Sequence, residues 1–381
     1  MNKFLTLGLI AGAGALMAGC AKDAANSDFG QNAIEFGTYL GRDAQTKGEI
    51  TNTTSIGTSG FGVTAFYTGQ KKWTEYGTAT APNFMYNQQV TKSGDAWTYS
   101  PVKYWPTMKG DKISFFAYAP YNAAGIELAA KNATTANTSL TFTVQDDAAN
   151  MVDFVTAQVI DAQQKDAAAG GQDAVKFNLK HELSRLAFKV KTSDDMAAES
   201  HVVLKSVKLD ANASFYKSAT YTFGNTNAET GKWTASTALT TGYDIAGVLN
   251  FGEVKIGTES KQKSYTSAMD ITSATAKPLF QTDKYLFLIP VEGGLAEANK
   301  ASVTFQYDIV TVDANLTAGY SCTEATKTVY LPAGLLQQGK AYDVTFTFNV
   351  DQIEVAASVA DWATDASDSV NVPFTPDDAT K

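Results

Sequence analysis

Few residues in this 381-residue sequence have the side-chain chemistry for acid–base catalysis or for binding a transition metal. There are two histidines, His181 and His201, and two cysteines, Cys20 and Cys322. A zinc site usually takes several ligands of these kinds, and a hydrolase triad holds its histidine between a nucleophile and a carboxylate. His181 lies in a strand-like run and His201 follows an acidic stretch, so we predict that both are core or surface residues.

Sequence motifs of the common enzyme classes are absent as well. The chain contains no G-x-S-x-G elbow, no H-E-x-x-H zinc helix, no phosphate loop and no G-x-G-x-x-G fingerprint. The acidic pairs Asp146-Asp147 and Asp194-Asp195 lack the alternating spacing of a calcium loop, so we interpret them as solvated turns. The sequence therefore predicts no enzymatic activity, no metal site and no cofactor.

Composition narrows the class of protein further. Hydrophobic residues make up 44% of the chain and charged residues 18%, which is enough apolar material for a sizeable core and argues against disorder. The formal net charge is −9 and the sequence pI is about 4.9. Because an acidic surface repels phosphate backbones, we expect no nucleic-acid partner.

The amino terminus has the features of a lipoprotein signal peptide. Lys3 precedes an apolar stretch, Phe4–Met17, which is too short to span a membrane but fits a signal h-region. It leads into Leu16-Met17-Ala18-Gly19-Cys20, which resembles the bacterial lipobox. We expect residues 1–19 to be removed and Cys20 to carry lipid. Cys322 would then have no disulfide partner, and we interpret it as a buried or idle thiol.

The rest of the chain is patterned as short strands. Runs rich in aromatic and β-branched residues alternate with clusters of Gly, Asn, Asp and Ser. The predicted strands are Phe61–Tyr67, Ile113–Tyr118, Leu140–Val144, Ala187–Lys191, Ala219–Phe223, Tyr285–Val291, Ser302–Ile309, Lys327–Leu331 and Tyr342–Val350. Two Ala-rich stretches, Ala123–Lys131 and Asp161–Ala169, are compatible with short helices. This pattern predicts an all-β fold built from antiparallel β-sandwiches.

The length is typical of two domains, and one composition shift marks a boundary between them. Residues 161–172 are polar and rich in Ala and Gly, which is typical of a loop, and a long patterned segment, Val175–Phe188, follows. We place the junction near residue 182, so that the C-terminal domain would comprise residues 182–381.

An aromatic run, Trp97–Pro106, allows two interpretations. It holds two tryptophans and two tyrosines, and exposed flat rings can stack on sugars, as in a glycan-binding surface lipoprotein. Large aromatic side chains also dominate the burial in sandwich cores, and an apolar strand around Phe115 follows closely. We favour core packing.

Taken in order, these segments resemble the fimbrillin family, the subunits of type V pili of Gram-negative bacteria. Each matching segment is short, but together they cover most of the mature chain. They are Gly60–Gly69, Asn83–Asn87, Trp97–Pro106, Asp111–Tyr121, Phe177–Phe188 with its H-E-L-S-R-L core, and Tyr342–Trp362.

The resemblance implies a specific order of export, maturation and assembly. Family members are exported as lipidated precursors with two transthyretin-like β-sandwich domains, anchored at first to the outer membrane. An arginine-specific protease of trypsin-like specificity removes the N-terminal segment with the first strand, and a strand from a neighbouring subunit fills the exposed groove. The resemblance therefore implies partners that are other copies of the chain and other pilus subunits, and a final place in a cell-surface fimbrium that supports adhesion and biofilm formation.

The maturation site maps to the bond between Arg42 and Asp43. A short strand candidate, Ala33–Phe36, precedes it, and the only other arginine, Arg185, lies inside a patterned strand. Cleavage there would make residues 20–42 a propeptide and leave residues 43–181 as the N-terminal domain.

Two C-terminal segments are candidates for the donated strand. In Ile353–Val359 the residues Ile353 and Val355 belong to an alternating apolar edge, and in Val370–Phe374 the residues Val370, Val372 and Phe374 do. A chain end can leave its own domain without unfolding it, which favours the second segment. The alternative function is a surface lipoprotein of the same fold that binds glycans and does not polymerise.

Overall fold

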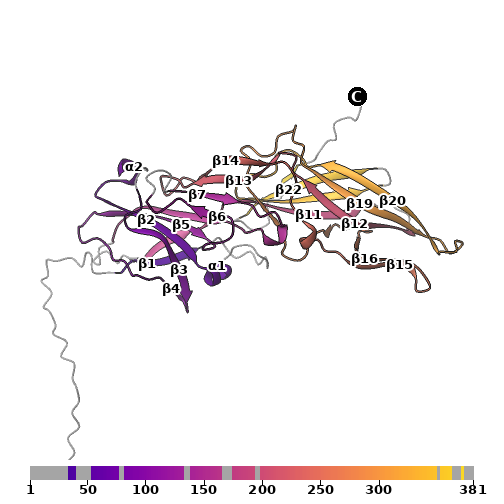
Figure 1. The fold of residues 1–381 in the computed structure, drawn as a ribbon, viewed down its shortest axis with the longest axis horizontal. Coiled ribbons are helices and arrows are strands. Elements are labelled where there is room, and N and C mark those ends of the chain that lie inside the picture. Colours follow the sequence, from indigo (N-terminus) through magenta and orange to yellow (C-terminus); the bar gives the residue numbers. More distant parts are fainter. Residues whose placement is uncertain are drawn as a thin grey trace, which may run out of the picture.

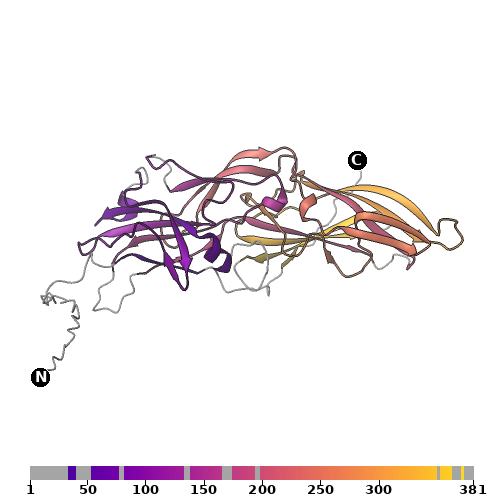
Figure 2. The same cartoon turned by 60° about the horizontal axis from the view of Figure 1, so that its bottom comes forward.

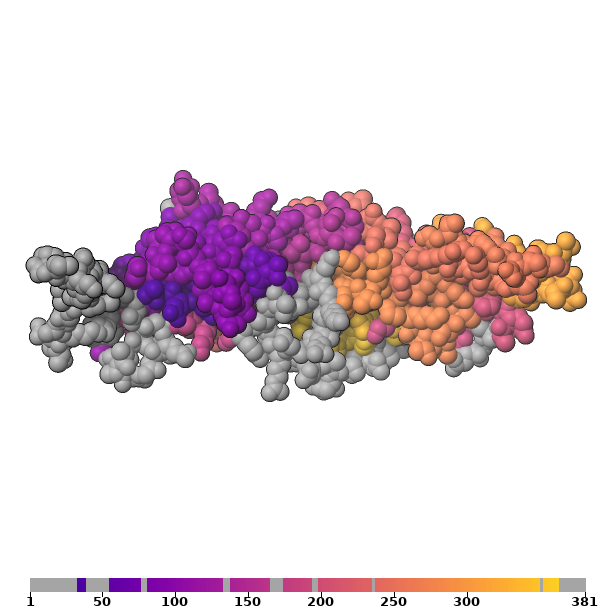
Figure 3. All heavy atoms as spheres, turned by 90° about the horizontal axis from the view of Figure 1, so that it is seen from below, coloured from indigo at the N-terminus to yellow at the C-terminus, as the bar shows by residue number. Residues whose placement is uncertain are grey.

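Strands account for most of the computed structural model, which describes residues 33–39, 53–76, 81–132, 138–164, 174–193, 198–349, 352–362 and 370–372. The helices within these ranges are single short turns or little more: α1 (Thr53–Ser59), α2 (Trp73–Tyr76), η1 (Ala148–Asn150) and η3 (Ala246–Val248). The chain forms an elongated body, with the early strands at one end and the late strands at the other (Figure 1, Figure 2 and Figure 3). The predicted all-β fold is confirmed.

A six-stranded antiparallel sheet forms the centre of the N-terminal half. Its order from edge to edge is β10 (Lys180–His181), β8 (Val155–Ala162), β5 (Lys112–Ala119), β2 (Phe61–Gly69), β3 (Met85–Ser93) and β4 (Ala96–Thr98). We call it the central sheet.

Both faces of the central sheet are buried. In β5, Ile113 and Phe115 point into one apolar cluster, while Phe116 and Tyr118 point into another on the opposite face. Alternate residues of a strand lie on opposite faces, so a strand covered on both sides reads as a continuous apolar run rather than an alternating one. This explains the sequence Ile-Ser-Phe-Phe-Ala-Tyr, which has apolar residues on both faces and a single polar one, Ser114.

Two smaller sheets cover these faces. A parallel pair, β1 (Glu35–Tyr39) and β9 (Ala174–Asn178), lies over the face that carries Phe61 and Phe115. The other face is covered by a four-stranded sheet in the order β14 (Lys232–Leu239), β13 (Phe215–Thr222), β7 (Ser139–Thr143) and β6 (Ile126–Leu128). Figure 1 shows β13 and β14 beside β7, although they come much later in the chain.

The C-terminal half is a sandwich of two further sheets. The first has the order β17 (Lys277–Pro278), β11 (Ser184–Thr192), β21 (Lys340–Phe348), β22 (Ile353–Asp361) and β23 (Val370–Val372), with β18 (Leu286–Leu288) also on β11. The second has the order β15 (Gly252–Thr258), β16 (Lys261–Asp270), β12 (Ser200–Asp210), β19 (Ser302–Val312) and β20 (Tyr320–Tyr330). Phe305 packs between Phe346 and Phe348, at ring-centroid distances of 4.9 and 5.2 Å, and so joins the two layers.

Most predicted strands are found near their expected positions. The segment Tyr285–Val291 is a strand only over β18, and two of the pairings, β1 with β9 and β11 with β21, are parallel. The helical interpretation of Ala123–Lys131 is wrong, because Ile126–Leu128 pairs with β7 as β6. Asp161 and Ala162 of the second Ala-rich stretch belong to β8, and its residues 165–169 lie outside the described chain.

The junction near residue 182 does not divide the sheets, because β13 and β14 follow it in sequence but pair with β7 from before it. One apolar cluster also runs through both halves, from Phe66 in β2 to Ala357 in β22. The domain boundary and the transthyretin-like character of the two halves remain predictions.

A buried carboxyl group ties the halves together at this junction. Glu182 is 2% exposed, and Thr156 Oγ1 in β8 donates to its Oε1 at 2.7 Å while the amide of Gln338 donates to its Oε2. The hydroxyl of Tyr221 in β13 lies 2.8 Å from the same Thr156 oxygen. Burial raises the pKa of the Glu182 carboxyl to about 7 from 4.5, although the hydrogen bonds and the charge of Lys180 oppose the rise.

This raised pKa predicts a dependence of stability on pH. Between about pH 4.5 and 7 the folded chain binds more protons than the unfolded chain, so the free energy of unfolding falls as the pH rises. Relative to Glu182→Gln, which cannot ionise, the wild type should lose about 2–3 kcal/mol of unfolding free energy between pH 5 and pH 8. Urea unfolding of both proteins at the two pH values measures this change in unfolding free energy.

The matched control is Glu259→Gln, which changes an exposed glutamate in the turn between β15 and β16. Its unfolding free energy should follow that of the wild type at both pH values. Parallel pH profiles for wild type and Glu182→Gln would contradict the assignment.

Candidate functional site: the groove of the first strand and the C-terminal strands

The first described strand, β1, fills an apolar groove on the central sheet. Ile34, just before β1, is 1% exposed and Phe36 is 5% exposed. The Phe36 ring has four aromatic neighbours at centroid distances from 5.1 to 6.3 Å, which are Phe61, Tyr99, Phe115 and Phe177. We call the site lined by these four residues the β1 groove.

The backbone of this segment is held on both sides. Along one side β1 pairs in parallel with β9, from Glu35 opposite Ala174 to Tyr39 opposite Asn178. On the other side the Ile34 N–H donates to the Lys103 carbonyl at 2.8 Å, and the Tyr99 hydroxyl donates to the Ile34 carbonyl at 2.7 Å. The groove thus offers backbone partners to an extended segment and pockets for its alternate side chains, which are the requirements for binding a donated strand.

The predicted strand Ala33–Phe36 therefore lies in the groove, shifted so that β1 runs from Glu35 to Tyr39. Ala33 makes an isolated bridge to Tyr104. Losing residues up to Arg42 would take away all of β1 and uncover the four aromatic side chains of the β1 groove. Cys20, Arg42 and Asp43 themselves lie outside the described residues.

Core packing is confirmed for Trp105, and Tyr99 and Trp97 are partly buried against the same apolar cluster. Trp105 is 3% exposed, Tyr99 contacts Phe36, and Trp97 packs edge-on against Phe61 at 5.0 Å. Tyr104 is the exception, at 56% exposed. Because the other three rings are committed to the core around the groove, the run leaves little flat aromatic surface for stacking on a sugar.

The segment Ile353–Val359 is part of β22, which is integrated into its own sheet. All nine residues of β22 pair with β21, from Ile353 opposite Phe348 to Asp361 opposite Lys340. Val355 and Ala357 are 8% and 7% exposed and belong to the large apolar cluster. Removing this strand would cost both its backbone bonds and that apolar burial.

The later segment is attached far less firmly. β23 spans Val370–Val372 at the edge of the sheet and pairs with β22 only from Ala357 opposite Val372 to Val359 opposite Val370. Phe374 lies outside the described residues.

The remaining chemistry-bearing residues have structural partners. His181 Nδ1 lies 2.9 Å from Asp153 Oδ2 and its ring stacks on Trp362, while His201 Nδ1 lies 3.1 Å from Asp270 Oδ2. The Arg185 guanidinium lies over the Tyr285 ring, 4.5 Å from its centroid.

Cys322 is half-buried and belongs to a polar cluster in the C-terminal sandwich. Its Sγ donates to Asp308 Oδ2 at 3.4 Å, and Lys205 Nζ lies 2.5 Å from Asp308 Oδ1. Burial and the neighbouring carboxylate raise the pKa of the Cys322 thiol, which disfavours the reactive thiolate.

The acidic pairs do not converge on a metal. Asp146 pairs with Lys217 at 2.7 Å, Asp147 caps η1 by accepting from the Ala149 N–H, and Asp194-Asp195 lie outside the described residues. Within the described ranges no cluster of three or more His, Cys, Asp or Glu is placed to hold a metal ion. Nor does any helix in those ranges combine the length and the apolar character needed to cross a membrane.

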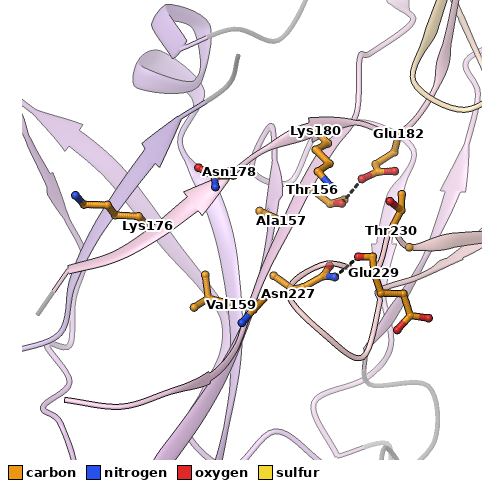
Figure 4. Close-up of a pocket in the computed structure, with 12 residues that line it drawn as sticks. Thr156, Ala157, Val159, Lys176, Asn178, Lys180, Glu182, Asn227, Glu229 and Thr230 are labelled. Carbon is orange, nitrogen blue, oxygen red and sulfur yellow. Dashed lines mark hydrogen bonds between the residues drawn. The ribbon is translucent and has the colours of Figure 1, made fainter. Parts of the chain in front are cut away.

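A pocket of about 310 Å³ lies beside Glu182, between β8, β9 and residues 227–231 (Figure 4). Polar groups line most of it and are partly engaged with one another. The Ile160 N–H donates to Asn227 Oδ1 at 2.6 Å, and Gln158 Nε2 donates to the Glu229 carbonyl at 2.6 Å. The Asn227 side chain thus takes the place of a neighbouring strand at Ile160 of β8, because its amide nitrogen also donates to the Ile160 carbonyl, and we assign the pocket a structural role.

Three comparisons with known proteins relate the chain to fimbrial proteins. Residues 50–362 match the model of the fimbrillin-like family. The chain is 30% identical over 374 residues to the fimbrium subunit Fim1C of Phocaeicola vulgatus, which covers 93% of this chain and 96% of that protein. It also resembles the crystal structure of a fimbrial protein from Bacteroides vulgatus, with a TM-score of 0.73 and 26% identity, over 87% of this chain and all of that one.

The family match extends from before α1 to the end of β22 and therefore includes the central sheet, the lining of the β1 groove apart from β1 itself, and the C-terminal sandwich. With a match of this extent and a relative at 30% identity over nearly the whole length, the chain belongs to the fimbrillin-like family.

Proposed function

We propose that this protein is a structural subunit of a cell-surface fimbrium that polymerises by strand exchange and supports adhesion and biofilm formation. The observation that carries the proposal is the position of β1. This strand is not part of the central sheet, yet its Phe36 side chain fills an aromatic groove on that sheet. Family membership supports the same role. The function requires no catalytic group, because backbone pairing and apolar burial provide the binding energy.

Maturation would free the groove by cutting after Arg42. Two arginines occur in the sequence, and the second, Arg185, is a poor substrate because its guanidinium packs on Tyr285 and its Nε is buried. An arginine-specific protease of trypsin-like specificity would therefore act at Arg42. The same cut would release the chain from a lipid on Cys20.

The donated strand would be Val370–Phe374. Within this segment, β23 is paired with β22 at three residues. β22, in contrast, is paired with β21 at nine residues and buries Val355. The shorter strand therefore exchanges at lower cost, since fewer backbone bonds must be broken. Pro373 lacks an N–H, so pairing with a neighbour would be interrupted at that residue.

The first prediction concerns the anchor. A single acyl chain binds membranes only marginally, so a lipoprotein anchor carries several chains on its first residue. Cells that express the wild type should incorporate radiolabelled palmitate into the protein, and Cys20→Ala should lose the label. Cys322→Ala is the control and should keep it; equal labelling of the Cys20 variant would rule out this anchor.

The second prediction concerns maturation. Arg42→Lys keeps the positive charge but should not be cut by an arginine-specific protease, so it should accumulate as a lipidated monomer with β1 in place. Arg42→Ala should behave in the same way. The measurement is an immunoblot of outer-membrane fractions heated mildly in SDS, which compares the amount of monomer with the ladder of SDS-resistant polymers.

Fibres of normal length from both Arg42 variants would show that the proposed site is wrong. If the wild type itself forms no ladder, the strand-exchange function fails before the site is tested.

The third prediction concerns the donor. Truncation after Ser369 removes β23 while leaving β22 and its burial intact, so it should give a folded, processed monomer that cannot extend a fibre. Truncation after Thr375 is the matched control, because it keeps Val370–Phe374 and should polymerise. Electron microscopy counts fibres, and normal fibres from the shorter chain would move the donor role to β22.

A further inference from the structure

Trp362, the residue after β22, stacks on two other rings. Its indole stacks on His181 at a centroid distance of 4.2 Å and an interplanar angle of 4°, and on Phe287 at 5.7 Å and 6°. The Arg185 guanidinium lies 5.7 Å from the centre of the indole. We call the parallel group of His181, Trp362 and Phe287 the three-ring stack.

The partners of the stack are themselves fixed. The His181 side chain is 7% exposed and pairs with Asp153, whose side chain is fully buried. Arg185 and Phe287 lie on the paired strands β11 and β18, opposite each other. The stack therefore joins the C-terminal end of β22 to strands from both halves of the molecule.

The backbone at Trp362 is also held. Its N–H donates to the Gly339 carbonyl at 3.1 Å, and Gly339 has a φ of +67°, a conformation that favours glycine. The preceding residue, Asp361, pairs with Lys340 both across the strands and through its side chain. Several contacts thus converge on the last residues of β22.

This location has a mechanical consequence. A donated strand that holds a neighbouring subunit pulls on the chain that follows Trp362. Each backbone bond alone contributes little, and the end of a strand opens more readily than its middle. An anchor resists this only if it lies at the end where the pull begins, which in β22 is the Asp361–Trp362 end.

We propose that the three-ring stack is the anchor at which tension from the donated strand enters the body of the subunit, with Trp362 as its positioning residue. The stack separates the part of the C terminus that stays, through residue 362, from the part that is donated. This inference rests on the proposed function, because it assumes that the donor follows Trp362.

The first test uses hydrogen exchange on the full-length monomer and does not depend on strand exchange. Trp362→Ala removes both ring contacts, and the amides of Ile353–Asp361 should then exchange about tenfold faster. Trp362→Phe keeps a flat ring and should restore most of the protection. Amides of β2 and β5, in the central sheet, should be unchanged in both variants.

The second test compares fibres of the same three proteins. Trp362→Ala fibres should dissociate in SDS at a lower temperature than wild-type fibres, and Trp362→Phe fibres should resemble the wild type. Wild-type behaviour of Trp362→Ala in either test would overturn the proposal, as would a loss of protection that extends to β2 and β5. If the wild type forms no fibres, the proposed function fails, and the exchange data alone decide whether the stack anchors β22.

Discussion

The central sheet carries apolar side chains on both faces, and the need to cover both of them is the constraint on which the rest of the structure depends. Phe61 and Phe115 point to one face, and Phe66 and Phe116 point to the other. An uncovered face of this size would bring the chain out of solution or into contact with another chain. Every other sheet of the N-terminal half is placed so as to prevent this.

The two covers differ in how they are attached. The four-stranded sheet combines strands from both sides of residue 182, and the buried Glu182 network fixes it to β8 and to the loop before β21. The cover formed by β1 and the preceding Ile34 relies on the buried side chains of Ile34 and Phe36 and on backbone bonds to β9 and to Lys103. The first cover cannot leave without opening the main core. In the proposed function, an extended segment with suitable alternating side chains replaces β1 in the second cover.

Local pattern predicted the strands but not how they pair. The run Ile113–Tyr118 was recognisable as a strand because its residues are aromatic or β-branched, whereas its burial on both faces depends on β13, about a hundred residues away. Trp105 and Tyr104 are neighbours of similar chemistry, yet Trp105 is buried against Phe115 and Tyr104 is exposed, which their residue types do not predict. Glu182 and Trp362 carried no signal beyond their place in family-like segments, since Glu182 meets Gln338 and Trp362 meets His181 across more than a hundred residues.

The side chains that line the β1 groove belong to one apolar cluster and those of β22 to another, and the strands of the central sheet connect the two clusters. Phe66 and Phe116, on the reverse side of the strands that line the groove, belong to the same apolar cluster as Val355 and Ala357 of β22. Force received at the groove would therefore reach the C terminus through packed side chains and paired strands, without a joint between the halves. Interiors packed in this way deform little, because any displacement opens voids or forces strained rotamers. If Cys20 carries lipid as proposed, Cys322 has no disulfide partner, and packing of this kind would have to make the chain stiff enough for a fibre, with both ends of the path anchored. At the groove the anchor is aromatic burial, and at the C terminus it is the ring stack that closes β22.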